Sequence, residues 1–75
     1  MPIDDASPEY PYQQAAAELR RRIQAGELGP RLPSQADLAE ELGISHMTLK
    51  RALQILRDEG LIVGQPGRGT FVRGD

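Results

Sequence analysis

The segment Ser34–Gly60 constrains the fold most, because two helix starts and two helix stops follow one another within it. Ser34 is a good N-cap residue, and Asp37 follows near the positively charged end of the helix that Ser34 opens. Gly43 can adopt the positive φ that ends this helix, and Ser45 can cap the next one after a single intervening residue. The segment therefore predicts two helices joined by a very short turn.

The apolar positions of these two helices suit a close crossing. We expect the buried side chains to be Leu38, Ala39, Leu42, Leu49, Ala52, Leu53 and Leu56. Ala39 is small enough to let the helices approach, and Ile44 can pack on Leu49 as a hydrophobic staple across the turn. This combination is typical of a helix-turn-helix unit.

An earlier helix is predicted from Pro11 to about Ala25, with Gly26 as its stop. Its apolar stripe comprises Tyr12, Ala16, Leu19 and Ile23. We expect Gly26–Pro33 to be a loop, because this stretch holds two glycines and two prolines. Residues 1–10, which are rich in proline and acidic residues, are predicted to form a flexible arm.

After the third helix the pattern changes to short runs of β type. Leu61–Val63 and Thr70–Val72 are predicted strands, and Gln65–Gly69 is the predicted turn between them. The expected fold class is therefore mainly α with a small β-hairpin. It corresponds to a winged helix-turn-helix domain, with three helices and a two-stranded wing, over residues 11–75.

Length and composition exclude several classes of function. The chain has 75 residues and no cysteine, and His46 is its single histidine. We therefore predict one small domain with no metal, no other cofactor, no enzymatic activity and no deep site for a small molecule. No apolar run is long enough to span a membrane, and the N-terminus is acidic rather than basic. We predict a cytoplasmic protein that does not act at membranes.

The net charge of −2 conceals an uneven distribution of charge along the chain. Three acidic residues lie within the first nine positions, whereas residues 10–75 carry nine basic and eight acidic side chains. Between Ser45 and Arg57 there are three basic residues and no acidic residue. A basic face on a nearly neutral domain can bind phosphate. The arginines at 20–22 on the first helix are predicted to be solvated or to face a partner.

A set of short motifs runs in order from Tyr12 to Val72. It comprises Leu32-Pro33-Ser34, Leu38-Ala39, Leu42-Gly43-Ile44-Ser45, Thr48, Ala52-Leu53, Glu59-Gly60-Leu61-Ile62 and Gly67-Arg68-Gly69-Thr70-Phe71-Val72. This ordered set resembles the GntR-type winged helix-turn-helix transcription regulators of bacteria. The resemblance implies sequence-specific binding to double-stranded DNA, with the third helix in the major groove and the wing in the minor groove. It also implies a homodimer on a palindromic operator.

The candidate DNA-binding residues lie at helix starts, on the outer face of the third helix and in the wing. They are Ser34, Ser45, His46, Thr48, Lys50, Arg51, Arg57, Arg68 and Gly69. Lys50 is the main candidate for reading a base. It belongs to an outward stripe that also contains Met47, Gln54 and Arg57.

The other candidates are expected to contact the DNA backbone or the minor groove. Thr48, Arg51 and Arg57 suit phosphates, and we expect the two arginines to share the outer half of their helix. Arg68 suits a narrow minor groove, and Gly69 lets the wing backbone approach DNA. The two serines are predicted caps at helix starts, where free backbone N–H groups can bind phosphate. The aromatic residues Tyr10, Tyr12 and Phe71 are expected to serve packing.

Three positions depart from the family pattern, which usually has arginine where this chain has Ala36, His46 and Lys50. Lys50 keeps the charge but lacks the planar fork that reads guanine, and Ala36 offers neither charge nor a hydrogen bond. These departures leave an alternative open: a winged-helix protein-interaction adaptor that has lost tight DNA binding. Salt-dependent binding to duplex DNA distinguishes the two functions.

Overall fold

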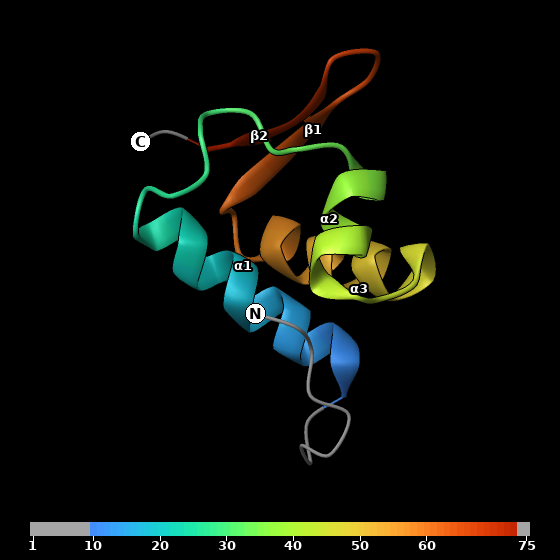
Figure 1. Cartoon of the computed structure of the whole chain (residues 1–75). Coiled ribbons are helices and arrows are strands. Elements are labelled where there is room, and N and C mark those ends of the chain that lie inside the picture. The colour runs from blue at the N-terminus through green and yellow to red at the C-terminus, as the bar shows by residue number, and fades with distance from the viewer. Residues whose placement is uncertain (1–9, 74–75) are drawn as a thin grey trace.

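The computed structural model of the chain describes residues 10–73, where three helices are followed by an antiparallel hairpin (Figure 1). The elements are α1 (Pro11–Gln24), α2 (Gln35–Leu42), α3 (His46–Asp58), β1 (Ile62–Gln65) and β2 (Gly69–Val72). The predicted fold class and order of elements are confirmed. Residues 1–9 of the predicted arm lie outside the described residues, as do residues 74–75. Within the described range, no helix is both long and apolar enough to cross a membrane.

The joint between α2 and α3 is as short as predicted. Ser34 and Ser45 cap the two helices, since each side-chain oxygen accepts the backbone N–H three residues further on at 3.1 Å. Gly43 has a φ of 70°, and the N–H of Ile44 donates to the carbonyl oxygen of Ala39 at 3.0 Å. Glycine adopts this left-handed conformation without strain, so α2 stops and the chain turns directly into α3.

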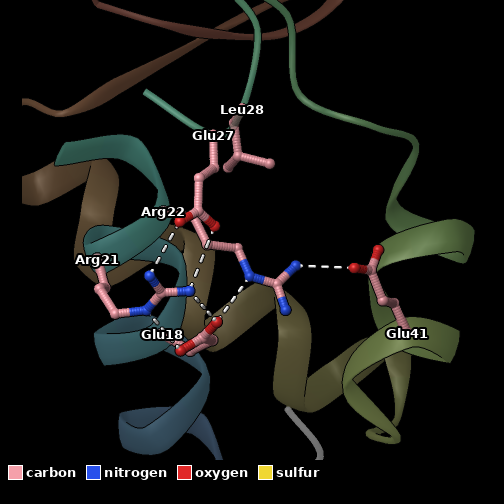
Figure 2. A pocket seen from close by; sticks show the side chains of 6 residues that line it. All are labelled: Glu18, Arg21, Arg22, Glu27, Leu28 and Glu41. Carbon is pink, nitrogen blue, oxygen red and sulfur yellow. Dashed lines mark hydrogen bonds and ion pairs between the residues drawn. The ribbon is translucent and has the colours of Figure 1, made fainter. Parts of the chain in front are cut away.

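The predicted apolar stripe of α1 is only partly right. Its two central members are buried, whereas Tyr12 and Ile23 at its ends are half-buried. Arg22 is buried beside them and forms ion pairs with Glu18, at 2.7 Å, and with Glu41 of α2, at 2.9 Å (Figure 2). The aliphatic part of an arginine side chain can cover apolar surface while its guanidinium is paired. A pattern of hydrophobic residues therefore does not predict the burial of Arg22.

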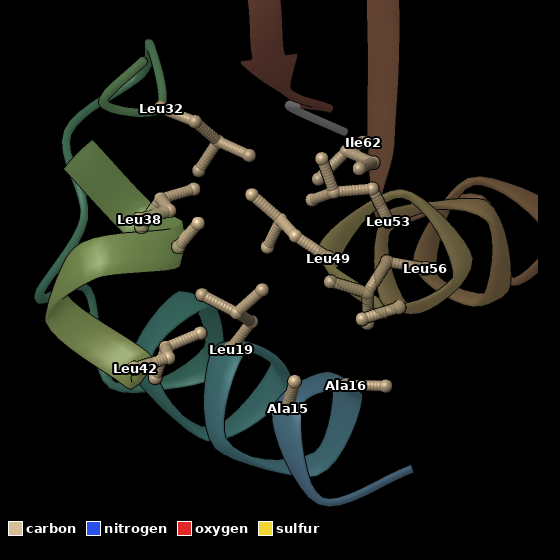
Figure 3. Close-up of a cluster of buried hydrophobic side chains, with 12 residues drawn as sticks. Ala15, Ala16, Leu19, Leu32, Leu38, Leu42, Leu49, Leu53, Leu56 and Ile62 are labelled. Carbon is tan, nitrogen blue, oxygen red and sulfur yellow. The ribbon is translucent and has the colours of Figure 1, made fainter. Parts of the chain in front are cut away.

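Side chains from the three helices, the loop before α2 and β1 meet in one hydrophobic core (Figure 3). It comprises Ala15, Ala16, Leu19, Leu32, Leu38, Ala39, Leu42, Leu49, Ala52, Leu53, Leu56 and Ile62. All the buried positions predicted in α2 and α3 are confirmed. Ala15, Leu32 and Ile62 were not predicted in the core. Leu32 and Ile62 anchor the loop and the hairpin to the helices. The wing is therefore held in a fixed position relative to α3.

The hairpin is longer than predicted. Gln65 and Gly69 belong to the strands, where they pair with each other, so the turn is reduced to residues 66–68. Leu61 lies before β1, and its N–H completes the stop of α3 by donating to the carbonyl oxygen of Leu56 at 3.0 Å. Gln65 and Gly69 pair through their backbones. The sequence prediction relied on alternating apolar side chains, so it did not include these two residues in the strands.

The segment Gly26–Pro33 is only in part a free loop. Its last residues run along β2, where the N–H of Leu32 donates to the carbonyl oxygen of Thr70 at 2.9 Å. Arg31 stands opposite Phe71 in an antiparallel bridge. The expected loop therefore ends in a short extended segment that borders the wing.

Candidate nucleic-acid interface

The first turn of α3 presents a hydroxyl group that can donate to a ligand. The Oγ of Ser45 accepts the N–H of Thr48 at 3.1 Å and donates to the Oγ1 of Thr48 at 3.0 Å. Because Thr48 accepts in this pair, its own hydroxyl hydrogen can be donated to an acceptor outside the chain. A DNA phosphate is such an acceptor. The neighbouring His46 is exposed.

The stripe predicted on the outer face of α3 is exposed along its whole length. Met47 is 70% exposed, and Lys50, Gln54 and Arg57 are exposed with it. The amide of Gln54 is oriented by its neighbours, since it donates to Asp58 at 2.8 Å and accepts from Arg57 at 3.2 Å. The stripe thus offers a basic side chain and an oriented amide to a ligand.

Arg57 connects α3 to the wing. Its Nη2 lies 3.4 Å from the position that a side chain would take at Gly64 of β1. Arg57 lines a hollow of about 290 Å³ together with Gln35 and Lys50, and a second one of about 520 Å³ against the wing. The structure therefore brings the candidates Lys50 and Arg57 together and places Arg57 beside the hairpin.

Arg51 does not share this face of α3. Its guanidinium carbon lies 5.8 Å from the ring centre of Tyr12, which belongs to α1. Arg51 and Arg57 are both exposed, as expected for the outer half of the helix, but the helical rotation between them directs Arg51 towards α1 and Arg57 towards the wing. Tyr10 stacks on Tyr12 with the ring centres 5.8 Å apart, and it is 66% exposed rather than part of the core.

Arg68 and Gly69 lie where the hairpin turn meets β2. Arg68 is exposed, and its N–H closes the turn by donating to the carbonyl oxygen of Gln65 at 2.9 Å. Gly69 has a φ of 113°, a conformation that residues with a side chain rarely adopt. Position 69 therefore carries no side chain of its own, and the guanidinium of Arg31 lies against it, with Nε 3.1 Å from the position that a Cβ would take.

Ser34 and Gly69 border a hollow of about 520 Å³ between the start of α2 and β2. Three further polar side chains that line it, Arg31, Gln35 and Thr70, are missing from the site residues predicted from the sequence. The sequence carries one weak signal for Arg31, a basic residue directly before the motif Leu32-Pro33-Ser34. Its position beside the wing depends on tertiary pairing.

The basic residues fall into two groups. On α1, Arg21 pairs with Glu18 and Glu27, and Arg22 pairs with Glu18 and Glu41 (Figure 2). Arg20 pairs with Glu59. The prediction that these arginines are solvated or face a partner is wrong for Arg22, which is buried. Six basic residues have no carboxylate within ion-pair distance in the described range, and we call them the unpaired bases: Arg31, Lys50, Arg51, Arg57, Arg68 and Arg73.

The ion pairs of α1 stay charged near neutral pH. Hydrogen bonds from Arg21 and Arg22 lower the pKa of Glu18 from 4.5 to about 2. A hydrogen bond from Arg20 likewise lowers the pKa of Glu59. Four carboxylates are used by three arginines, so the positive charge that remains for a ligand on α3, the hairpin turn and the segment before α2 belongs to the unpaired bases other than Arg73, which lies next to Gly60 at the base of the hairpin.

The short joint between α2 and α3, the exposed face of α3 and the basic hairpin beside it define a winged helix-turn-helix DNA-binding domain. The family model for bacterial regulatory proteins of the gntR family matches residues 11–72. The chain belongs to this family, as its sequence motifs predict.

Curated relatives are longer regulators. The chain is 46% identical to the HTH-type transcriptional repressor NagR of Bacillus subtilis over 74 residues, which cover 96% of this chain and 30% of the relative. It is 43% identical to the histidine utilization repressor of Klebsiella aerogenes over 63 residues, covering 81% of this chain and 26% of the relative. The chain therefore spans less than a third of the length of these relatives.

Solved structures share the fold closely. YtrA from Sulfolobus acidocaldarius, a GntR-family transcription factor, superposes with a TM-score of 0.85 and 39% identity over 97% of this chain and 79% of that chain. The structure of AraR(DBD) in complex with operator ORE1 gives a TM-score of 0.82 and 28% identity, over 96% of this chain and 90% of that chain.

Proposed function

We propose that this chain binds double-stranded DNA sequence-specifically, as the DNA-recognition domain of a bacterial transcription regulator. In this proposal α3 enters the major groove and the hairpin enters the adjacent minor groove. The observation that carries it is the concentration of unpaired bases on α3, the wing and the segment beside them, whereas the arginines of α1 are neutralised. An α-helix fits the major groove, and unpaired basic side chains supply phosphate contacts.

Each candidate residue has a role in this arrangement. Lys50 reads a base edge from the exposed stripe of α3, and His46 lies at the first turn, next to the same groove. Thr48, Arg51 and Arg57 bind phosphates. Arg68 enters the minor groove, and the lack of a side chain at Gly69 lets the wing approach the DNA. The helix starts capped by Ser34 and Ser45 offer backbone N–H groups to the DNA backbone.

We further propose that two copies bind a palindromic operator and that the chain acts by binding rather than by catalysis. One α3 and one wing contact only a short half-site. Two copies related by a two-fold axis contact two half-sites, so the sequence that is recognised becomes longer. The similarity to AraR(DBD), which is in complex with an operator, supports DNA as the ligand.

A selection from random duplex DNA, followed by a salt titration, tests the proposed function. Duplexes recovered at low salt define the operator, and binding isotherms are then measured between about 50 and 200 mM salt. With about five phosphate contacts per domain, we expect a slope of log affinity against log salt of about −4 to −5. A flat response, or a selection that enriches no sequence, would contradict the proposal and favour a protein-interaction adaptor.

A further inference from the structure

One guanidinium outside the predicted site is held between α2 and the wing. Arg31 pairs with β2 in antiparallel fashion. On either side of it, the N–H of Leu32 donates to the carbonyl oxygen of Thr70 at 2.9 Å, and the N–H of Val72 donates to that of Pro30 at 2.8 Å. Leu32 is buried in the core. The backbone of Arg31 is therefore fixed as in a strand, although it belongs to no helix or strand of the fold.

Gly69 provides the space that the side chain of Arg31 occupies. On one face of an antiparallel pair, a long side chain reaches the diagonal neighbour two positions along the partner strand. For Arg31, which stands opposite Phe71, that neighbour is Gly69. A side chain at position 69 would begin 3.1 Å from the Nε of Arg31 and 3.4 Å from its Nη2. The guanidinium thus lies directly against the wing backbone beside Arg68.

The surroundings of Arg31 suit an anion. Arg31 is exposed and is one of the unpaired bases. It lines the hollow of about 520 Å³ between the start of α2 and β2 with Ser34, Gln35 and Thr70, and no acidic side chain of residues 10–73 lines that hollow. Ser34 and Gln35 contribute polar groups that are neutral, so the positive charge of Arg31 dominates the hollow.

We propose that Arg31 binds a phosphate of the DNA backbone, and this proposal rests on the proposed function. If α3 and the wing enter adjacent grooves, one sugar-phosphate backbone runs between them. The hollow opens between the start of α2 and the wing, and Gln35 lines both this hollow and the one beside Lys50 and Arg57 of α3. A guanidinium fixed there therefore lies close to the path proposed for that backbone. Arg31 also supplies charge near the start of α2, where Ala36 has none.

Salt dependence of binding measures this contact directly. The probes are the selected operator and a pool of labelled random-sequence duplexes of about 20 base pairs. Arg31→Ala and Arg31→Gln should each weaken binding to both probes about three- to tenfold near 100 mM salt and reduce the salt slope by about one. Arg31→Lys should keep the slope, because it keeps the charge. Preference for the operator over the pool should not change, since a phosphate contact carries no base information.

Arg73→Ala is the matched control, because Arg73 is also exposed and unpaired but lies next to Gly60 at the base of the hairpin. It should keep the affinity and slope of the parent. Thermal unfolding verifies that each variant is folded. If Arg31→Ala is unstable, Arg31→Gln replaces it in the test, because glutamine keeps most of the aliphatic part of the side chain and removes only the charge. If Arg31→Gln has the same slope of log affinity against log salt as the parent, the proposed Arg31 contact is wrong, whereas the proposed function stands. Absence of DNA binding by the parent itself would instead overturn the proposed function and the contact together.

Discussion

At three positions where the gntR pattern usually has arginine, this chain has Ala36, His46 and Lys50, and the consequences of the three differ. Ala36 removes a charge near the start of α2, where Arg31 stands on the wing side. Lys50 keeps a positive charge on the exposed stripe of α3 but binds as a point charge rather than as a planar fork. We therefore expect a sequence preference that differs from that of family members with all three arginines.

The role of Lys50 gives a prediction at the scale of a single side chain. Lys50→Ala should weaken binding to the selected operator by about 1–3 kcal/mol and relax the preference at one base pair. Lys50→Arg should keep the affinity and shift that preference towards guanine, because the fork can bond two acceptors of one base. Repeated selection with each variant measures both effects. Met47→Ala, on the same stripe, is the control, and an unchanged selection with Lys50→Ala would show that Lys50 reads no base.

At the scale of the elements, the helix boundaries could be predicted because the residues that set them act locally. Ser34 and Ser45 each cap through a hydrogen bond to a backbone N–H three residues away. Gly43 and Gly60 adopt the left-handed conformations that end α2 and α3. Such contacts span a few residues, so spacing and residue type are sufficient to predict them.

The features that the sequence did not predict depend on partners far along the chain. Arg31 is placed by β2, and the burial of Arg22 requires Glu41 on another helix. Arg51 is drawn to Tyr12 by the packing of α3 on α1. Most of the fold and most of the candidate residues could therefore be inferred from local patterns, whereas the partners of the basic side chains could not.

Arg68 in the hairpin gives a prediction at the scale of the elements. Arg68 is exposed where the turn meets β2, and a narrow minor groove has an enhanced negative potential that attracts arginine. Arg68→Ala should therefore weaken binding more on operators with A·T-rich flanks than on the same operators with G·C-rich flanks. Isotherms on the two duplexes test this. Equal losses on both would mean that the wing does not read groove width.

At the scale of the whole molecule, charges that stabilise the fold are separated from charges available to a ligand. The ion pairs of α1 connect it to α2 and to the end of α3 through Glu41 and Glu59. Five of the unpaired bases lie on α3, in the hairpin turn and in the segment before α2, and the sixth, Arg73, lies at the base of the hairpin. Changes in the first group should alter stability with little effect on DNA binding.

Glu18 tests this separation through the pH dependence of stability. Its pKa in the folded chain, about 2, lies below 4.5, so the stability it contributes is fully present above about pH 4.5 and is lost as the pH falls towards 2. Glu18→Gln should therefore be less stable than the parent at pH 7, and the difference should shrink towards pH 2. Urea unfolding at several pH values measures it, with Glu40→Gln as the exposed control. A difference that is independent of pH would show that the loss comes from packing rather than from charge.

The proposed pairing of two copies makes a final prediction about assembly. Each chain presents one α3 and one hairpin, so a single copy contacts one half-site and two copies gain from a palindrome only if they are linked. Fusing a dimerising coiled coil after Asp75 should raise the apparent affinity for the selected palindrome by roughly 10²–10⁴-fold, because the second binding event becomes intramolecular. The gain should disappear on a single half-site, and also when about five base pairs are inserted between half-sites, which places them on opposite sides of the duplex. An unchanged affinity for the palindrome on fusion would mean either that the unfused chain already dimerises or that the operator does not consist of paired half-sites. Sedimentation of the unfused chain with and without DNA distinguishes these two outcomes.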